Sequence, residues 1–229
     1  MAFRPIFIAT KSTKKPVSIK RMEFEWVHGR SKIQKQKLVK RLHYAANSFG
    51  IENILEASSK SENELGVSLS AFNLCGTYGE NEFPVECIYQ SSKVFLNGGP
   101  FKSIMHLTPY EAKKDKRLRQ SGELINFEHN GMKWLKEPET AFYDWIYINA
   151  VARRSDLLNA IEKYWAFTDI EFNSSKQISC QARSLALLRN LMSRNMLDQV
   201  LRSRELFLDQ YPPIVKEQGT LDLFSFSSI

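Results

Sequence analysis

Residues 85–95 read Val-Glu-Cys-Ile-Tyr-Gln-Ser-Ser-Lys-Val-Phe, directly after a proline that the first turn of a helix tolerates. This pattern predicts a helix over residues 85–96, on which Glu86, Gln90 and Lys93 fall at i, i+4 and i+7 along one face. The other positions are mostly apolar or aromatic, so the helix is predicted to be well buried. A buried stripe of carboxylate, amide and ammonium is unfavourable unless its members are paired or used in chemistry. The alternative is an exposed amphipathic helix whose Glu and Lys face water.

Helices and short strands are expected on both sides of this stretch. Alternation of apolar and polar residues predicts strands at 3–9 and 17–27, and a helix follows to about residue 48 with Ser31 as its N-cap. The remaining assignments are a strand at 54–57, a loop over 66–83, and helices over 109–120, 140–151, 155–165 and 181–208.

These assignments predict an α+β fold that is mainly α, a helical domain with a small N-terminal β-sheet. The length of 229 residues and the hydrophobic content of 43% fit a single domain with a sizeable core. Within it we expect a basic, β-rich N-terminal extension over 1–30, a mainly helical region over 31–208 that holds the candidate site, and a tail over 209–229.

Composition also excludes several classes of protein. No run approaches the roughly 18 apolar residues of a membrane helix, and the first residues lack the pattern of a cleaved secretory signal. Three cysteines without metal-ligand spacing (Cys75, Cys87 and Cys180) fit neither a disulfide framework nor a zinc site, and the four histidines form no metal pattern. We therefore expect a cytoplasmic protein with no metal, no membrane partner and no cofactor.

Positive charge is concentrated at the start of the chain. Residues 1–41 carry twelve Lys and Arg against two Glu, a net charge of +10 in a chain whose formal charge is +7. Such polarity is typical of a surface that contacts phosphate backbones, although a solvated helix face and a flexible arm would give the same pattern. The candidate nucleic-acid contacts are Lys32, Lys35, Lys37 and Lys40.

The stretch from 85 to 95 resembles the signature helix of the NADAR family, which reads Ser-Glu-His-Tyr-Phe-Gln-Ala-Gln-Lys-Phe; the family consists of N-glycosidases that act on ADP-ribosylated guanosine. The matching residues are Glu86, Gln90, Lys93 and Phe95, and in the same order further along Pro109, Ala112, Lys113, Arg117 and Trp134.

The likeness is closer to the NADAR branch that is encoded beside DarT-type toxins, which ADP-ribosylate guanine in DNA. Blocks similar to those of that branch lie at residues 58–61, 69–74, 85–95, 98–100, 142–145, 167–173 and 179–182. One departure matters. Ordinary NADAR proteins carry an acidic residue in a Trp-Gly-Asp-Gly loop, which is absent here, so the second acidic group is either Asp169 or Glu171.

The resemblance implies a role for each matched residue in cleaving an N-glycosidic bond. Glu86 would stabilise the positive charge that builds up on the ribose ring, and Asp169 would be a second acid or base. Gln90 would bind ribose hydroxyls or hold the carboxylate. The other candidate substrate contacts are Asn73 (ribose or base), Lys93 (Glu86 or a phosphate), Lys113 and Arg117 (the pyrophosphate), and Trp134 (stacking on a base).

Simpler structural roles compete with several of these assignments. A lone tryptophan is more often part of a core, Asn73 could form an Asx-turn, Asp169 could cap a turn, and the Lys113–Arg117 face could merely be solvated.

Three functions remain open on this basis. The first is a hydrolase that removes ADP-ribose from guanine in DNA and is paired as antitoxin with a DarT-type toxin. The second is a basic antitoxin that acts by binding alone, with Glu86 structural. The third is a NADAR-fold N-glycosidase for a small metabolite such as a riboflavin-pathway intermediate. The basic N-terminal segment favours a nucleic-acid substrate over a free metabolite.

Overall fold

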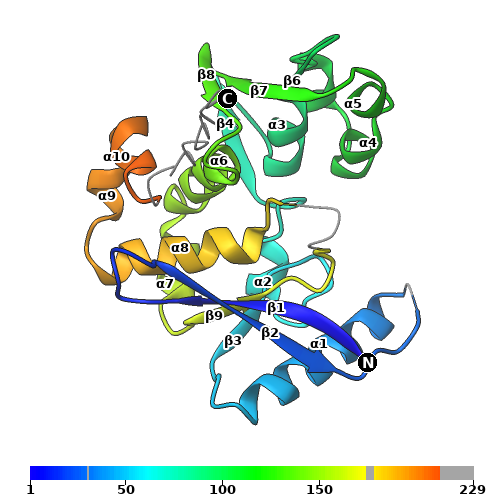
Figure 1. Ribbon diagram of the computed structural model, residues 1–229, viewed down its shortest axis with the longest axis vertical. Coiled ribbons are helices and arrows are strands. Elements are labelled where there is room, and N and C mark those ends of the chain that lie inside the picture. Colours follow the sequence, from blue (N-terminus) through cyan, green and yellow to red (C-terminus); the bar gives the residue numbers. More distant parts are fainter. Residues whose placement is uncertain (30, 174–177, 212–229) are drawn as a thin grey trace, which may run out of the picture.

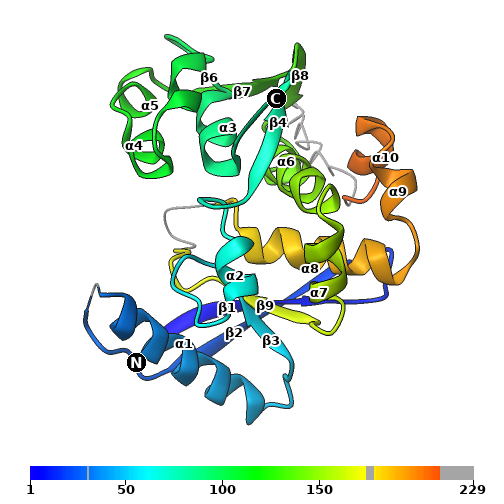
Figure 2. The ribbon, with the colours of Figure 1, turned by 180° about the vertical axis from the view of Figure 1, so that it is seen from behind.

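A computed structural model describes residues 1–29, 31–173 and 178–211 (Figure 1). A four-stranded sheet and its covering helices form one end of the molecule, and two smaller sheets with α3, α4 and α5 form the other. Helices α6 and α8 lie between the two ends in both views (Figures 1 and 2). The chain is thus mixed α/β, with more β-structure than the small N-terminal sheet that the sequence predicts.

The large sheet joins the N-terminus to a segment far along the chain. Its strand order is β2-β1-β9-β3; β1 is antiparallel to β2 and β9, and β3 is parallel to β9. The bounds are Ala2–Ala9 (β1), Val17–Phe24 (β2), Ile54–Glu56 (β3) and Ala166–Thr168 (β9). The three strands predicted from the sequence are confirmed, although β2 ends before residue 27. Because β1 hydrogen-bonds to β9, the N-terminal strands are continuous with the rest of the fold.

Period-two alternation buries both faces of this sheet. Ile6 packs with Leu38 and Leu42 of α1 (Lys32–Asn47), whereas the next residue, Phe7, packs into the main core with α8 (Gln181–Ser193). The Ser31 hydroxyl accepts a hydrogen bond from the backbone N–H of Gln34, which confirms the expected N-cap of α1.

The second half of the chain forms the central helices. They are α6 (Ala141–Ala152), α7 (Ser155–Ile161), α8, α9 (Leu197–Val200) and α10 (Arg204–Leu208). The helix predicted over 140–151 is confirmed, and the one predicted from 155 ends four residues early. The single helix predicted over 181–208 is wrong, because Asn195 adopts a left-handed φ of 55° after α8 and the Ser203 hydroxyl caps the separate helix α10.

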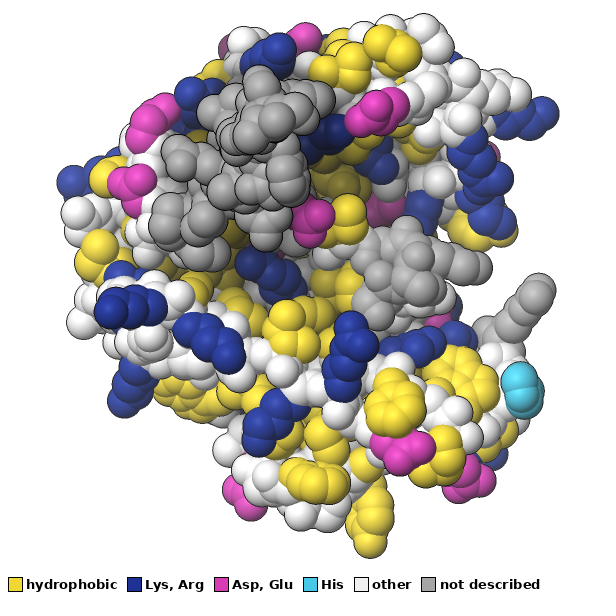
Figure 3. Space-filling model, viewed as in Figure 1, with side chains coloured by type: hydrophobic (Ala, Val, Ile, Leu, Met, Phe, Trp, Pro, Cys, Tyr) yellow, Lys and Arg dark blue, Asp and Glu magenta, His cyan; other side chains and the backbone are white. Residues whose placement is uncertain are grey.

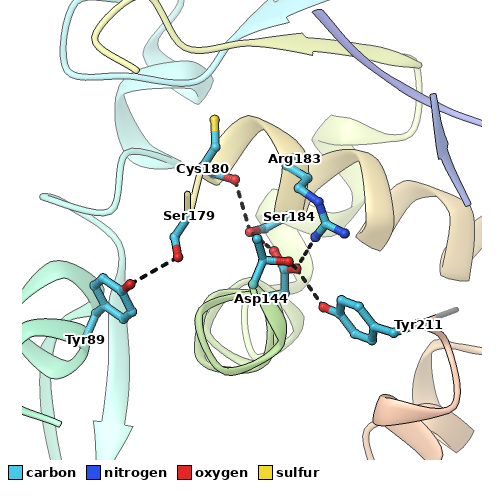
Figure 4. A network of polar contacts seen from close by, with 8 residues as sticks. Tyr89, Asp144, Ser179, Cys180, Arg183, Ser184 and Tyr211 are labelled. Atoms are coloured by element: carbon cyan, nitrogen blue, oxygen red, sulfur yellow. Dashed lines mark hydrogen bonds and ion pairs between the residues drawn. The ribbon is translucent and has the colours of Figure 1, made fainter. Parts of the chain in front are cut away.

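A buried carboxylate ties α6 to α8 (Figure 4). Asp144 is fully buried and accepts hydrogen bonds from the hydroxyls of Ser184 (2.6 Å), Tyr211 (2.6 Å) and Thr140 (2.7 Å). It also forms an ion pair with Arg183. Since every one of these groups donates to the carboxylate, the charge is well satisfied despite its burial.

The remaining elements surround residues 85–95. They are α2 (Glu64–Ser68), β4 (Cys75–Tyr78), β5 (Asn81–Pro84), α3 (Val85–Ser91), β6 (Lys93–Phe95), the 3-10 helix η1 (Lys102–His106), α4 (Pro109–Lys114), α5 (Arg117–Gln120), β7 (Leu124–His129) and β8 (Met132–Leu135). The loop predicted over 66–83 is therefore wrong, because it contains the end of α2 and most of the hairpin β4-β5. The helix predicted over 109–120 is split in two at Asp115, whose carboxylate accepts the backbone N–H of Arg117.

Helix α3 is shorter than predicted. The hydroxyls of Ser91 and Ser92 both donate to the carbonyl of Ile88, at 3.0 and 2.8 Å, in competition with backbone donors. Residues 93–95 then pair as strand β6 with β7. Lys93 consequently lies on a strand and not on the helical face that the sequence predicts.

Candidate functional site

The polar residues of the signature stretch face a cavity of about 910 Å³. Its walls come from both ends of the molecule: α3, β6, α4 and α5 on one side, and the segments after β3 and β9 on the other. Six of the residues singled out in the sequence line it, namely Glu86, Gln90, Lys93, Lys113, Asp169 and Glu171. Figure 3 shows basic and acidic side chains mixed over this face of the molecule.

Glu86 and Gln90 form the buried floor of the cavity. Their side chains are only 5% and 6% exposed, and Gln90 Nε2 donates a 2.9 Å hydrogen bond to Glu86 Oε1. One turn of α3 produces this contact, as the i, i+4 spacing predicts. The Gln90 Oε1 atom is buried and has no hydrogen-bond partner in the described chain.

Lys93 stands beside this pair on the neighbouring strand. Burial lowers the pKa of its ammonium to about 8, the negative charge of Glu86 acts against that shift, and Lys113 adds to it. The ammonium lies 4.7 Å from the ring centroid of Tyr89. A backbone contact fixes the strand here: Gly99 has a φ of +87°, and a Cβ on it would lie 2.3 Å from the carbonyl oxygen of Lys93.

Asp169 contributes a second carboxyl group from the opposite wall. Burial, together with the nearby charge of Glu56, raises the pKa of Asp169 to about 8. Its Oδ1 accepts the backbone N–H of Glu171 at 2.9 Å. Glu171 also lines the cavity, but it is exposed and paired with Lys35. Asp169 is therefore the carboxyl group that holds a proton near neutral pH.

Glu56, which sequence reasoning missed, holds the segment around Asp169 in place through hydrogen bonds. It is 3% exposed, and its two oxygens accept hydrogen bonds from the hydroxyls of Ser58 and Thr168 and from the backbone N–H of Ile170, at 2.6 to 2.9 Å. Burial raises the pKa of this carboxyl group as well. The only sequence signal was a Glu at the end of a short apolar strand.

Gln181, at the start of α8, joins two loops of the cavity wall. Its Oε1 accepts the backbone N–H of Ala71 at 2.7 Å, and its Nε2 donates to the carbonyl of Ala57. The loop after Ala57 brings Ser58, Ser59 and Lys60 to the cavity, and the loop at Ala71 brings Ser70 and Phe72. The motif block around 179–182 thus has a structural role that the sequence alone did not reveal.

Three residues that the sequence suggested do not line the cavity. Trp134 is 2% exposed in strand β8, packed on Phe142 and Trp145, which is the core role that was the simpler alternative. Arg117 makes a bidentate pair with Asp115. Asn73 donates from its side chain to the carbonyl of Val67.

Sequence reasoning also overlooked basic and aromatic lining residues. Lys60, Lys114 and Arg119 join Lys113 around the cavity, together with the aromatic side chains of Tyr110 and Tyr143. Arg119 lies two residues after Arg117 on α5 and lines the cavity, whereas Arg117 is paired with Asp115.

The four candidate lysines of α1 differ in their surroundings. Lys35 pairs with Glu171 at 3.0 Å, and Lys40 pairs with Glu62 at 3.0 Å. Lys32 and Lys37 are exposed, and neither forms an ion pair within the part of the chain that is described. Only Lys35 is therefore linked directly to a residue of the cavity.

Two features are absent from the described residues. No helix there is long and apolar enough to cross a membrane, and no group of three or more His, Cys, Asp or Glu side chains is arranged to hold a metal ion.

The carboxyl groups of Glu86, Asp169 and Glu171 line one cavity together with several basic side chains, and paired carboxyl groups are the class of arrangement that glycosidases use. The family comparison agrees with this class. Residues 2–220 match the model of the DarT1-associated NADAR antitoxins, and the chain belongs to this family. No curated protein matches the chain.

Membership confirms the family resemblance and gives the chain the role of an antitoxin paired with a DarT-type toxin. NADAR proteins are in general glycosyl-hydrolase-like.

Proposed function

We propose that this antitoxin hydrolyses the N-glycosidic bond between ADP-ribose and guanine in DNA. The observation that carries the proposal is the hydrogen-bonded Glu86–Gln90 pair, which faces the same cavity as Lys93 and Asp169. The pairing with a DarT-type toxin supports modified guanine as the substrate.

In the proposed reaction, the bond between the anomeric carbon of ADP-ribose and the guanine nitrogen breaks. Positive charge develops on the ribose ring, and the carboxylate of Glu86 stabilises it. Gln90 fixes the orientation of that carboxylate through the 2.9 Å hydrogen bond. A water molecule then adds its oxygen to the anomeric carbon and gives one proton to the Asp169 carboxylate, which has by then donated its own proton to guanine.

Proton transfer to the departing guanine nitrogen is assigned to Asp169. A carboxyl group with a pKa of about 8 keeps its proton at neutral pH and can donate it as the bond breaks. The products are free ADP-ribose and unmodified guanine, so the toxin's modification is reversed. Glu86 and Asp169 thus have different roles because their environments differ.

The pyrophosphate is assigned to the basic wall of α4 and α5. Lys113, Lys114 and Arg119 line the cavity there. Arg117, the arginine proposed from the sequence, is replaced in this role by Arg119, because Arg117 is already paired with Asp115.

The direct test is to incubate the protein with a guanine oligonucleotide that carries ADP-ribose and to follow the release of ADP-ribose. Wild type should release it with multiple turnovers, whereas Glu86→Gln should bind the oligonucleotide and leave it modified. Absence of release by wild type would contradict the proposal. An antitoxin that works by binding alone would then be the better explanation, supported by the basic N-terminal segment.

A further inference from the structure

A second cationic cluster, on the β1–β2–α1 side of the molecule, is joined to the cavity wall through Glu171. Trp26, just after β2, has the guanidinium of Arg4 4.9 Å and the ammonium of Lys35 5.5 Å from its ring centroid. Lys35 in turn pairs at 3.0 Å with Glu171, which lines the cavity. The elements β1, β2 and α1 thus bring two cations and an aromatic ring together on this side of the molecule.

Most of the donors of Arg4 are unused. One terminal nitrogen donates to the adjacent carbonyl of Phe3 at 3.0 Å, while Nε is buried and has no hydrogen-bond partner in the described chain. Partial burial lowers the pKa of the guanidinium, against the attraction of Asp169 and Glu171. A planar guanidinium with unpaired donors matches the geometry of a phosphate group.

Lys35 is held only weakly by its present partner. The Glu171 side chain is 43% exposed and that of Lys35 is 17% exposed, so water screens the pair from the Glu171 side. A phosphodiester that approaches from that side can replace Glu171 as the partner of Lys35. The lysine would remain against Trp26 in either state.

We propose that Arg4, Trp26 and Lys35 form a subsite for the DNA backbone phosphate next to the modified guanine. The proposal rests on the proposed function and deepens it, because it explains how the chain would prefer a polynucleotide to a free modified nucleoside. The pyrophosphate of ADP-ribose is assigned to α4 and α5, and Figures 1 and 2 show these helices and the β1–β2–α1 unit at opposite ends of the molecule. The pyrophosphate of ADP-ribose and the phosphate of the DNA backbone would thus bind to different groups of cationic side chains.

The test compares two substrates, ADP-ribosylated guanosine and a trinucleotide with ADP-ribosylated guanine at its centre. Arg4→Gln and Lys35→Gln should each raise KM for the trinucleotide about tenfold, while kcat and the KM for the nucleoside stay unchanged. Lys20→Gln, an exposed lysine of β2, is the matched control and should change neither. Thermal unfolding checks that each variant is folded. If Arg4→Gln does not fold, the result for Lys35→Gln alone tests the proposal.

An unchanged KM for the trinucleotide, or an equal rise with both substrates, would overturn the subsite. Failure of the proposed function has a different signature, because wild type would then hydrolyse neither substrate. In that case the subsite is still tested by measuring the binding of an unmodified oligonucleotide by fluorescence anisotropy. Arg4→Gln and Lys35→Gln should each weaken its binding and reduce the log–log salt slope by about one unit, and binding equal to wild type would overturn the subsite.

Discussion

The side-chain amide of Gln90 donates a 2.9 Å hydrogen bond to Glu86 Oε1 across one turn of α3. This contact uses one oxygen of the carboxylate and leaves the carbonyl oxygen of the amide buried without a partner. The contact lies wholly within α3, so Gln90 fixes the orientation of the Glu86 carboxyl group at the cavity.

Glu86→Gln should remove hydrolysis by several orders of magnitude while the protein remains folded. Gln has nearly the same shape and can still accept the hydrogen bond from Gln90, but it lacks the charge that stabilises the ring cation. The measurement is single-turnover release of ADP-ribose, with thermal unfolding as the check on folding. Glu139→Gln, at an exposed position, is the matched control. Turnover by Glu86→Gln close to that of wild type would exclude Glu86 from catalysis.

The pH dependence of hydrolysis should reflect the two groups whose pKa lies at about 8, Asp169 and Lys93. Above that pH Asp169 loses the proton that it would donate and Lys93 loses its charge, so kcat/KM should fall. The Asp169→Asn variant should hydrolyse the substrate slowly at all pH values. Its kcat/KM should keep only the pH dependence that is due to Lys93. A wild-type profile that stays flat from pH 7 to 10 would argue against an acid with this pKa.

The pH dependence of folding stability should also reflect the raised pKa of Asp169. The pKa of Asp169 is raised from 3.8 to about 8, so its contribution to stability is fully present below pH 4 and is lost as the pH rises through 8. As the pH rises from 4 to 8, wild type should lose this stability and Asp169→Asn should not. The free energy of unfolding of the variant should therefore rise relative to that of wild type by at least about 1 kcal/mol. Urea unfolding at both pH values measures the difference, and a constant difference would contradict the raised pKa.

The carboxylate of Asp144 should matter for stability and not for the chemistry. Asp144→Asn would leave the partly buried Arg183 without its charge partner, and breaking a buried pair in this way costs about 3–5 kcal/mol. Asp156→Asn is the matched control, because its pair with Arg154 is exposed, and it should leave the unfolding midpoint unchanged. Equal midpoints for both variants would show that the Asp144 network contributes little.

Local patterns in the sequence were enough to predict much of the fold. The alternation at 3–9, the cap at Ser31 and the apolar run at 140–151 each act through neighbouring residues, and the structure has the expected element at each place. Some errors arose at helix breaks made by local side-chain contacts, as at Asp115 and Ser203. Another arose where a distant partner decides. Lys93 extends as a strand because it pairs with Phe127, more than thirty residues further along.

Part of the cavity lining could be predicted from the sequence. The family signature singled out Glu86, Gln90, Lys93 and Lys113, and it left Asp169 and Glu171 as alternatives; all six line the cavity. Glu56 and Gln181 escaped notice because their partners at 168–170 and at 57 and 71 come together only in the folded chain.

The exposed lysines of α1 should contribute to DNA binding to different degrees. Replacing Lys32 and Lys37 with Gln should weaken binding and reduce the log–log salt slope by about one unit per lost phosphate contact. Lys40→Gln should have less effect, since Lys40 already pairs with Glu62. Binding is measured by anisotropy over a series of salt concentrations. A slope equal to that of wild type would assign these lysines to a merely solvated face.

Stoichiometry separates an enzymatic antitoxin from one that acts by binding. An enzyme turns over, so a small molar fraction of this protein should clear modified guanine from DNA while free ADP-ribose appears in step. A binding antitoxin must instead match its target in number. Glu86→Gln should still bind modified DNA, because the cavity keeps its shape and its basic wall of Lys113, Lys114 and Arg119.

Such a variant should therefore protect cells poorly when the paired toxin is co-expressed, even though it binds the modified DNA. The assay measures survival and the level of modified guanine over a range of antitoxin expression, with Glu139→Gln as the folded control. Should Glu86→Gln rescue cells as well as wild type does, protection cannot depend on a charge at the cavity floor. Direct binding of the toxin or of its product would then account for the antitoxin role.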